Sequence, residues 1–306
     1  MRNITCVGSI LAALMVAGCG GGGGNSGLNS TPVAPDSVSK STSLINVTQN
    51  DDFAASTKQS SFTAAKGSGT ITSVGSVSGA ANTYVHYDVA SKRYTVGGLS
   101  STPSFSEANK SASKSNAVLS VYEKTSGSRN ETFLLFNPGA GNSSLALTYA
   151  SYGAWLIMDD RSTSIDANIS FFTFGTRTAA ADMPRTGTAS YNTIMDGIFA
   201  DSSGFYSLSG AGSFTADFGA STIAFQANPF AANQLGGPSK YLATFAGSGA
   251  IDSNTARFNG NTTNADGLRL DLNGYFYGPG AAEMAGTFSL SGMNATGVGA
   301  IAGKKN

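Results

Sequence analysis

Histidine and cysteine, the residue types that most often perform catalysis or bind metals, are scarce in this chain. Its 306 residues include one histidine, His86, and two cysteines, Cys6 and Cys19. A Ser-His-Asp or Cys-His nucleophile needs a histidine base, and a soft-ligand metal centre needs several His or Cys ligands. His86 alternates along the strand-like run Tyr84–Asp88, so we expect a sheet residue. We predict no catalytic residue, no metal site, no cofactor and no enzyme activity. Haem ligation by His86 or a tyrosine is an alternative.

Carboxylate pairs and the single tryptophan are the other candidates for chemistry. Asp51-Asp52 and Asp159-Asp160 could be acid–base groups or calcium ligands. Both pairs lie near predicted turns, and adjacent strand residues point to opposite faces, so we expect solvated turn residues. The glycine-rich runs Gly67-Ser68-Gly69 and Gly75-Ser76 lack the lysine and the helix of a phosphate loop. Trp155 could face a ligand, but we expect it to pack in the core or between domains.

The N-terminal segment predicts export. Arg2 precedes a mostly apolar run from Ile4 to Val16, which is shorter than the roughly 18 residues that a membrane-spanning helix needs. Val16-Ala17-Gly18-Cys19 resembles the lipobox of bacterial lipoproteins, in which the peptide is cleaved before the cysteine and the thiol carries lipid. The resemblance implies a signal peptide over residues 1–18 and lipidation, including palmitate, at Cys19. An ordinary secretory signal is the alternative.

Residues 19–43 are predicted to form a flexible tether. They begin with the glycine run Gly20–Gly24 and continue with serine, asparagine and proline, a composition that behaves as a coil. Cys6 lies in the segment to be removed and Cys19 would be acylated, so we expect no disulfide. The exported domains must therefore be stabilised by their hydrophobic core.

The overall composition excludes one class of partner. Lysine plus arginine and aspartate plus glutamate each number 18, which gives a formal net charge of zero. A nucleic-acid-binding surface needs an excess of basic residues, so we predict no nucleic-acid partner. The length is sufficient for one large domain or two small ones.

From residue 44 onward the sequence predicts an all-β chain. It is rich in Thr, Ser, Tyr, Phe and Gly and has no convincing helical period, although a short helix around Asp51–Ala65 is an alternative. Residues 44–180 are expected to form an antiparallel β domain. Its predicted strands are Tyr84–Val89, Arg93–Gly97, Ala117–Lys124, Glu131–Asn137, Leu145–Trp155 and Ile169–Thr176.

Residues 181–306 predict a more regular domain of eight strands with short, antiparallel connections. The strands are Gly187–Gly197, Phe205–Phe218, Ser221–Asn228, Tyr241–Ile251, Thr255–Thr262, Gly267–Tyr277, Glu283–Ser291 and Gly297–Gly303. Repeated glycines inside these strands indicate bends where a sheet closes into an eight-stranded barrel. A β-sandwich is the alternative. A membrane-spanning barrel is disfavoured, because its outward face would carry Arg269 and Asp271.

This second domain resembles the β-barrel of transferrin-binding protein B and related bacterial surface lipoproteins. The similarity lies in Met183–Tyr191, Phe214–Phe218, Gly274–Phe288 and Val298–Lys305, and its most specific part is Tyr-Gly-Pro-x-Ala-x-Glu-x-x-Gly-x-Phe from Tyr277 onward. We expect Gly278–Gly280 to form a tight reversal and Glu283 to begin the returning strand. The motif is interpreted as maintaining the barrel rather than as catalytic.

The resemblance implies both a fold and a function. The fold would be a handle-like antiparallel β domain, residues 44–180, followed by the eight-stranded barrel, residues 181–306. The function would be a lipid-anchored binding protein of the bacterial outer membrane, at the cell surface, that captures a protein, a haem source or an iron carrier for solute acquisition. The chain departs from the transferrin receptors in having one lobe and no long charged loops. Loops at the domain ends would bind, and no binding residue is assigned. A structural or assembly envelope lipoprotein is the alternative.

Overall fold

The computed structural model describes residues 39–80 and 82–306, which form an all-β molecule, as predicted. Within these residues the helical segments are two short 3₁₀ turns, η2 (Glu107–Asn109) and η3 (Pro279–Ala281). Across the described ranges, none of the helices has the length and apolar character that crossing a bilayer would require. Cys6, Cys19, the predicted signal peptide and most of the predicted tether lie outside the described residues.

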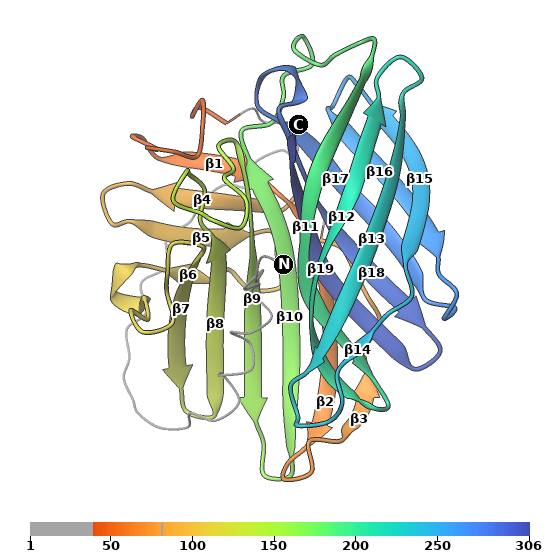
Figure 1. Ribbon diagram of the computed structural model, residues 1–306. Coiled ribbons are helices and arrows are strands. Elements are labelled where there is room, and N and C mark those ends of the chain that lie inside the picture. Colours follow the sequence, from red (N-terminus) through yellow and green to blue (C-terminus); the bar gives the residue numbers. More distant parts are fainter. Residues whose placement is uncertain (1–38, 81) are drawn as a thin grey trace.

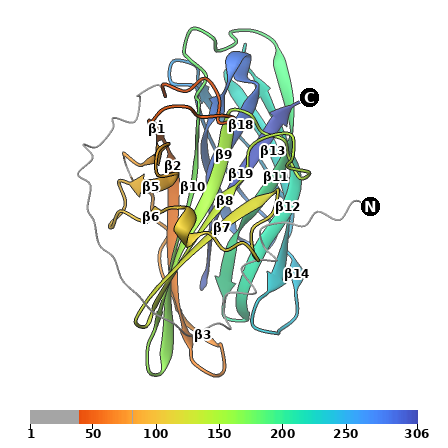
Figure 2. The same ribbon diagram turned by 90° about the vertical axis from the view of Figure 1, so that its left-hand side faces the viewer.

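Two antiparallel sheets precede the barrel (Figure 1). The four-stranded sheet has the order β1 (Asp51–Ala54), β4 (Tyr84–Asp88), β5 (Arg93–Gly97) and β6 (Ser104–Phe105). The six-stranded sheet has the order β3 (Ile71–Val74), β2 (Ser56–Ala65), β10 (Ser164–Gly175), β9 (Ala150–Asp160), β8 (Arg129–Phe136) and β7 (Leu119–Ser126). Figure 2 shows the four-stranded sheet and the barrel on opposite sides of the six-stranded sheet.

The alternative of a helix around Asp51–Ala65 is wrong, because this stretch forms β1 and β2. Phe62 and Ala64 are buried, whereas Ser61 and Thr63, which alternate with them, are partly exposed, as the period of two of a strand requires. The predicted strand Leu145–Trp155 in fact begins at Ala150. Leu147 is fully buried in the preceding loop, so its apolar side chain fitted the pattern of a strand although its backbone is not in one.

The barrel consists of eight antiparallel strands, which confirms the predicted fold class. In spatial order they are β12 (Gly204–Asp217), β11 (Thr188–Asp201), β19 (Ala295–Lys305), β18 (Glu283–Gly292), β17 (Arg269–Tyr277), β16 (Arg257–Thr263), β15 (Phe245–Asp252) and β13 (Thr222–Asn233). Pairing of β12 with β13 closes the sheet, which excludes the sandwich alternative. The short β14 (Lys240–Tyr241) pairs with β13.

Aromatic side chains fill the barrel interior. Phe258 lies at the centre of one group, with ring centroids 4.9 Å from Phe214 and 5.3 Å from Phe276. Leu270 and Leu272 point to the same interior, as the predicted alternation of β17 requires. This packing leaves the surface loops as the places where a large ligand can be recognised.

The six-stranded sheet is covered on both faces. One face packs on the outside of the barrel, where β11, β18 and β19 present small apolar residues such as Ala285, Val298 and Ala300. The other face packs on the four-stranded sheet through residues that include Phe133 and Phe172. Strands β2, β9 and β10 therefore lie in the central layer of the molecule, with the barrel on one face and the four-stranded sheet on the other.

The barrel has two different ends. We call the end that holds the connections 218–221, 253–256 and 278–282 the clamped end. The other, the hairpin end, holds the connections 202–203, 234–244, 264–268 and 293–294. In Figure 1 the C-terminus marks the clamped end at the top, and β14 lies at the hairpin end at the bottom.

Candidate functional site

The clamped end is fastened to the six-stranded sheet by the Glu283 carboxylate. Glu283 is fully buried at the first position of β18. Its Oε1 accepts a hydrogen bond from the Thr148 amide (2.7 Å), and its Oε2 accepts from the amides of Tyr149 (2.8 Å) and Ala150 (2.9 Å). Burial raises the pKa of Glu283 above its usual range, although the amides and Lys304 act in the opposite direction. A buried carboxylate needs such donors to be tolerated.

The turn before Glu283 completes this clamp. Gly278 and Gly280 have φ angles of 72° and 60°, which favour glycine. The Tyr149 ring lies directly against Gly278, where a Cβ atom would overlap it. The Thr178 hydroxyl donates to the Gly278 carbonyl at 2.6 Å. The predicted tight reversal and the predicted start of β18 at Glu283 are therefore confirmed, and the motif also joins the barrel to the preceding sheets.

Hydroxyl pairs extend the junction along β2. Ser56 Oγ lies 2.9 Å from Thr287 Oγ1, and Ser60 Oγ lies 3.0 Å from Thr296 Oγ1. Tyr152 donates a hydrogen bond to the buried Asp196 carboxylate on β11. Because these contacts join residues far apart in the chain, they fix the barrel and the six-stranded sheet in one relative position.

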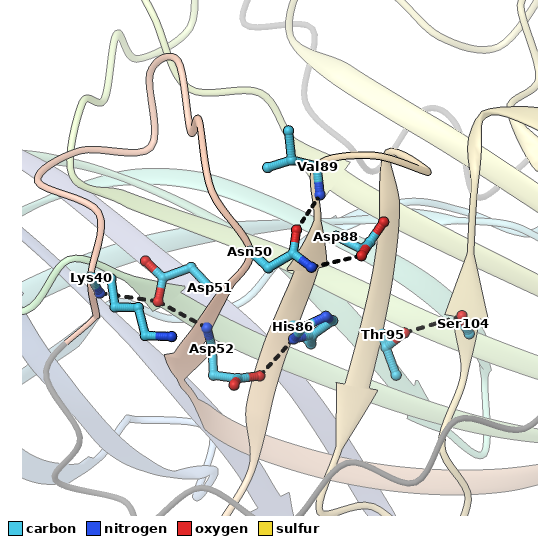
Figure 3. A network of polar contacts seen from close by, with 9 residues as sticks. All are labelled: Lys40, Asn50, Asp51, Asp52, His86, Asp88, Val89, Thr95 and Ser104. Atoms are coloured by element: carbon cyan, nitrogen blue, oxygen red, sulfur yellow. Dashed lines mark hydrogen bonds and ion pairs between the residues drawn. The ribbon is translucent and has the colours of Figure 1, made fainter.

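His86 lies in β4, as predicted, in a polar row across the four-stranded sheet (Figure 3). The row runs through Asp52, His86, Thr95 and Ser104 on neighbouring strands. His86 Nδ1 lies 2.8 Å from Asp52 Oδ1, and the Thr95 hydroxyl donates to Ser104 Oγ at 3.1 Å. Among the described residues no hydrogen bond joins the histidine to a hydroxyl. The row therefore has a His–Asp contact and a hydroxyl pair, but among the described residues no assembled nucleophile.

The prediction that Asp51 is a solvated turn residue is wrong. Asp51 lies in β1 and is 2% exposed. Its carboxylate accepts hydrogen bonds from the backbone amides of Lys40 (3.1 Å) and Ser41 (2.6 Å). The charge is satisfied by a segment ten residues earlier. That approach of residues 40–41 to β1 depends on the tertiary fold, so local sequence could not indicate it.

Asp159 and Asp160 match the prediction better. They end β9 beside a turn, and Asp160 is exposed and paired with Lys66 at 2.6 Å. Asp159 lies 3.8 Å from Arg129. In the described part of the chain, no group of three or more His, Cys, Asp and Glu side chains is placed to hold a metal ion.

Trp155 packs in the core between the two sheets, which confirms the favoured interpretation. It is 3% exposed, and its indole N–H donates to Glu131 Oε2 at 3.1 Å. Its cross-strand neighbours are Phe133 on β8 and Ser170 on β10. One side of the indole thus meets aromatic core and the other meets polar residues.

The sequence of the barrel matches a known family. Residues 183–305, less than half of the chain, match the family described as the C-lobe and N-lobe beta barrels of Tf-binding protein B. The predicted resemblance is confirmed. A search of curated proteins finds no match.

Solved structures of transferrin-binding protein B and related lipoproteins are also similar. Transferrin binding protein B from serogroup B Neisseria meningitidis is 18% identical over 81% of this chain and 43% of its own, with a TM-score of 0.43. A protein described as a surface lipoprotein is 17% identical over 82% and 98%, with a TM-score of 0.44. The N-lobe of lactoferrin binding protein B of Moraxella bovis is 16% identical over 61% and 79%, with a TM-score of 0.33. The chain thus spans less than half the length of the meningococcal protein.

Proposed function

We propose that this protein is a lipid-anchored binding protein of the bacterial outer membrane that captures an iron carrier or a haem source at the cell surface. The observation that carries the proposal is the match of residues 183–305 to the barrels of transferrin-binding protein B. The two sheets joined firmly to that barrel supply the scaffold that presents its loops. Binding proteins place recognition on loops held by a rigid framework.

The proposed organisation follows the sequence. Residues 1–18 are the signal peptide, Cys19 carries the lipid, residues 19–43 are the tether, residues 44–180 form the handle-like domain and residues 181–306 form the barrel. Val16-Ala17-Gly18-Cys19 supports the anchor. One acyl chain binds a membrane only marginally, so durable anchoring requires more than one.

We assign recognition of a protein ligand to the hairpin end of the barrel. Its connections include Tyr241, which is 79% exposed, and Met293, which is 94% exposed. The Tyr241 ring lies 4.8 Å from that of Phe230, so it is presented from a paired strand rather than from a free loop. Tyrosine and methionine are enriched at protein interfaces. At the clamped end, by contrast, Gly278 and Glu283 are occupied by their contacts to Tyr149 and to the backbone amides of residues 148–150.

Two experiments test the proposal. The full-length chain, purified in detergent and immobilised, is incubated with host serum, and captured proteins are identified by mass spectrometry; haemin is titrated separately and followed by its Soret band. We expect capture of a protein iron carrier or a saturable Soret shift at micromolar haemin. No captured protein and no shift, combined with a weakened envelope in a deletion strain, would contradict the proposal and favour a structural lipoprotein.

The anchor needs its own test, because a soluble protein could bind the same ligand. Cells are grown with labelled palmitate, and the label on the protein is compared between wild type, Cys19→Ala and the control Cys6→Ala. We expect label on the wild type and on Cys6→Ala and none on Cys19→Ala. Equal labelling of the two variants would contradict lipidation at Cys19.

A further inference from the structure

A pocket of about 270 Å³ lies on the face of the six-stranded sheet that also carries the four-stranded sheet. It is separate from the hairpin end and from the clamp. The volume is just below the range of about 300–1,000 Å³ that accommodates drug-sized ligands. The pocket therefore suits a ligand about the size of one sugar ring.

The floor of the pocket is set by strand register. Side chains directly opposite on neighbouring strands share one face of a sheet. Across β2, β10 and β9 two such rows lie in the pocket, namely Ser61–Asn168–Ile157 and Gln59–Ser170–Trp155. Each row thus places hydroxyl or amide groups beside one apolar side chain.

The walls come from two other segments. Ser76 and Ser78 follow β3, and this segment is held to β2 by the hydrogen bond from the Gly75 amide to the Ser61 carbonyl (2.7 Å). Ser78 and Gln59 also exchange backbone hydrogen bonds of 2.8 and 3.0 Å. A Cβ atom at position 75 would overlap the Ser61 hydroxyl, so glycine permits this close approach. Residues 100–101, which follow β5, complete the rim.

The lining is rich in hydrogen-bonding groups that the protein itself does not use. Within the described residues, six neutral side chains of the pocket have no side-chain hydrogen bond to protein: Ser61, Ser76, Ser78, Ser100, Ser101 and Asn168. Hydroxyls both donate and accept, and the amide does the same with separate atoms. The group can therefore satisfy a ligand that carries several hydroxyls.

The charges around the pocket favour a neutral ligand. Arg129 is the charged residue of the lining, and no carboxylate belongs to it. Glu131 and Asp159 lie 3.9 and 3.8 Å from the Arg129 guanidinium and compensate its charge. Trp155 and Ile157 are 3% and 7% exposed, so they form the closed floor of the pocket and the polar side chains around them make up its accessible surface.

We propose that this pocket binds one neutral sugar unit, either free or at the end of a glycan. The six unused polar side chains hold its hydroxyls, and Trp155 with Ile157 forms the floor beneath them. The proposal is independent of the proposed capture of iron carriers, because it concerns a different surface.

Trp155 is the only tryptophan of the chain, so its fluorescence reports directly on the pocket. The full-length chain, in a detergent without a sugar head group, is titrated with the methyl glycosides of galactose, glucose and mannose. We expect a saturable change with at least one of them, with a dissociation constant of about 1 mM. Glycerol and glucuronate, tested at equal concentration, should give no saturable change.

A pair of asparagine variants decides whether the change comes from the pocket. Asn168→Ala should weaken binding about tenfold, whereas Asn259→Ala, an exposed asparagine on β16 of the barrel, should leave it unchanged. Circular dichroism checks that both variants are folded, and Ser101→Ala on the rim provides a second variant. No saturable change with any of the three glycosides, or wild-type affinity in both Asn168→Ala and Ser101→Ala, would overturn the proposal.

Discussion

At the clamped end of the barrel a fully buried carboxylate binds three backbone amides, whereas at the hairpin end Tyr241 and Met293 are 79% and 94% exposed. Both ends belong to the same closed sheet and consist of the connections between its strands. The clamped end uses its polar groups within the molecule, and the hairpin end leaves large side chains in solvent. One end of the barrel is therefore a structural joint, and the other is available for recognition.

The largest effect should come from removing the clamp. Glu283→Ala leaves the amides of Thr148, Tyr149 and Ala150 without an acceptor in a buried site. We expect the free energy of unfolding to fall by about 3 kcal/mol, measured by urea unfolding. The exposed Glu107 gives the matched control, since Glu107→Ala should cost less than about 0.5 kcal/mol. Equal effects of the two variants would show that Glu283 is not a clamp.

A glycine at each end provides the second comparison. Gly278 and Gly267 have positive φ angles of 72° and 76°, but only Gly278 has a neighbour, Tyr149, in the space of a Cβ. Gly267→Ala should cost about 1 kcal/mol for the backbone conformation alone. Gly278→Ala should cost about 2 kcal/mol or more, because the Tyr149 ring must also move. A larger loss for Gly267→Ala in thermal unfolding would contradict the assignment of the two ends.

The pH dependence of stability tests the burial of Glu283. Burial raises the pKa of Glu283 in the folded chain above the ordinary value of 4.5 that holds in the unfolded chain. At a pH between the unfolded-state pKa and the folded-state pKa, the folded chain keeps a proton that the unfolded chain has released. Stability therefore falls as pH rises through this range and is regained as pH falls. For each unit by which the pH is lowered in this range, the free energy of unfolding of the wild type should rise by up to about 1.4 kcal/mol relative to that of Glu283→Gln. A relative loss of wild-type stability on acidification would contradict this.

The smallest effect on stability is expected at the hairpin end. Tyr241→Ala and Met293→Ala remove exposed side chains, so each should change the free energy of unfolding by less than about 0.5 kcal/mol. Thermal unfolding of the two variants checks this. A decrease of several degrees would mean that these side chains stabilise the fold and would remove the contrast between the ends.

The sequence predicted the barrel better than the sheets before it, for a physical reason. In β17, Leu270, Leu272 and Phe276 alternate with polar residues because one face is core and the other is solvent. The long strand β2 was missed because it belongs to the six-stranded sheet, which is covered by the barrel on one face, and Ser56 and Ser60 face Thr287 and Thr296 rather than water. A strand with polar residues buried by distant partners does not show a simple alternation.

For the candidate sites too, the sequence predicted the features that depend on local patterns and missed those that depend on tertiary contacts. The strand position of His86, the core position of Trp155 and the turn at Gly278–Gly280 follow from local patterns and were confirmed. The three donors to Glu283 lie more than 130 residues from it in the sequence, and two of the donors to Asp51, Lys40 and Ser41, lie about ten residues before it. Such contacts depend on how the sheets pack, which one sequence does not reveal. Cys19 remains a prediction.

Capture from serum by paired variants measures whether the hairpin end recognises a protein ligand. The immobilised full-length chain is compared as wild type, as the double variant Tyr241→Ala/Met293→Ala, and as Lys304→Ala, whose side chain binds the Ala146 carbonyl near the clamped end. We predict that wild type and Lys304→Ala capture the same serum protein and that the double variant captures at least about tenfold less. Equal capture by all three, or loss only in Lys304→Ala, would contradict recognition at the hairpin end.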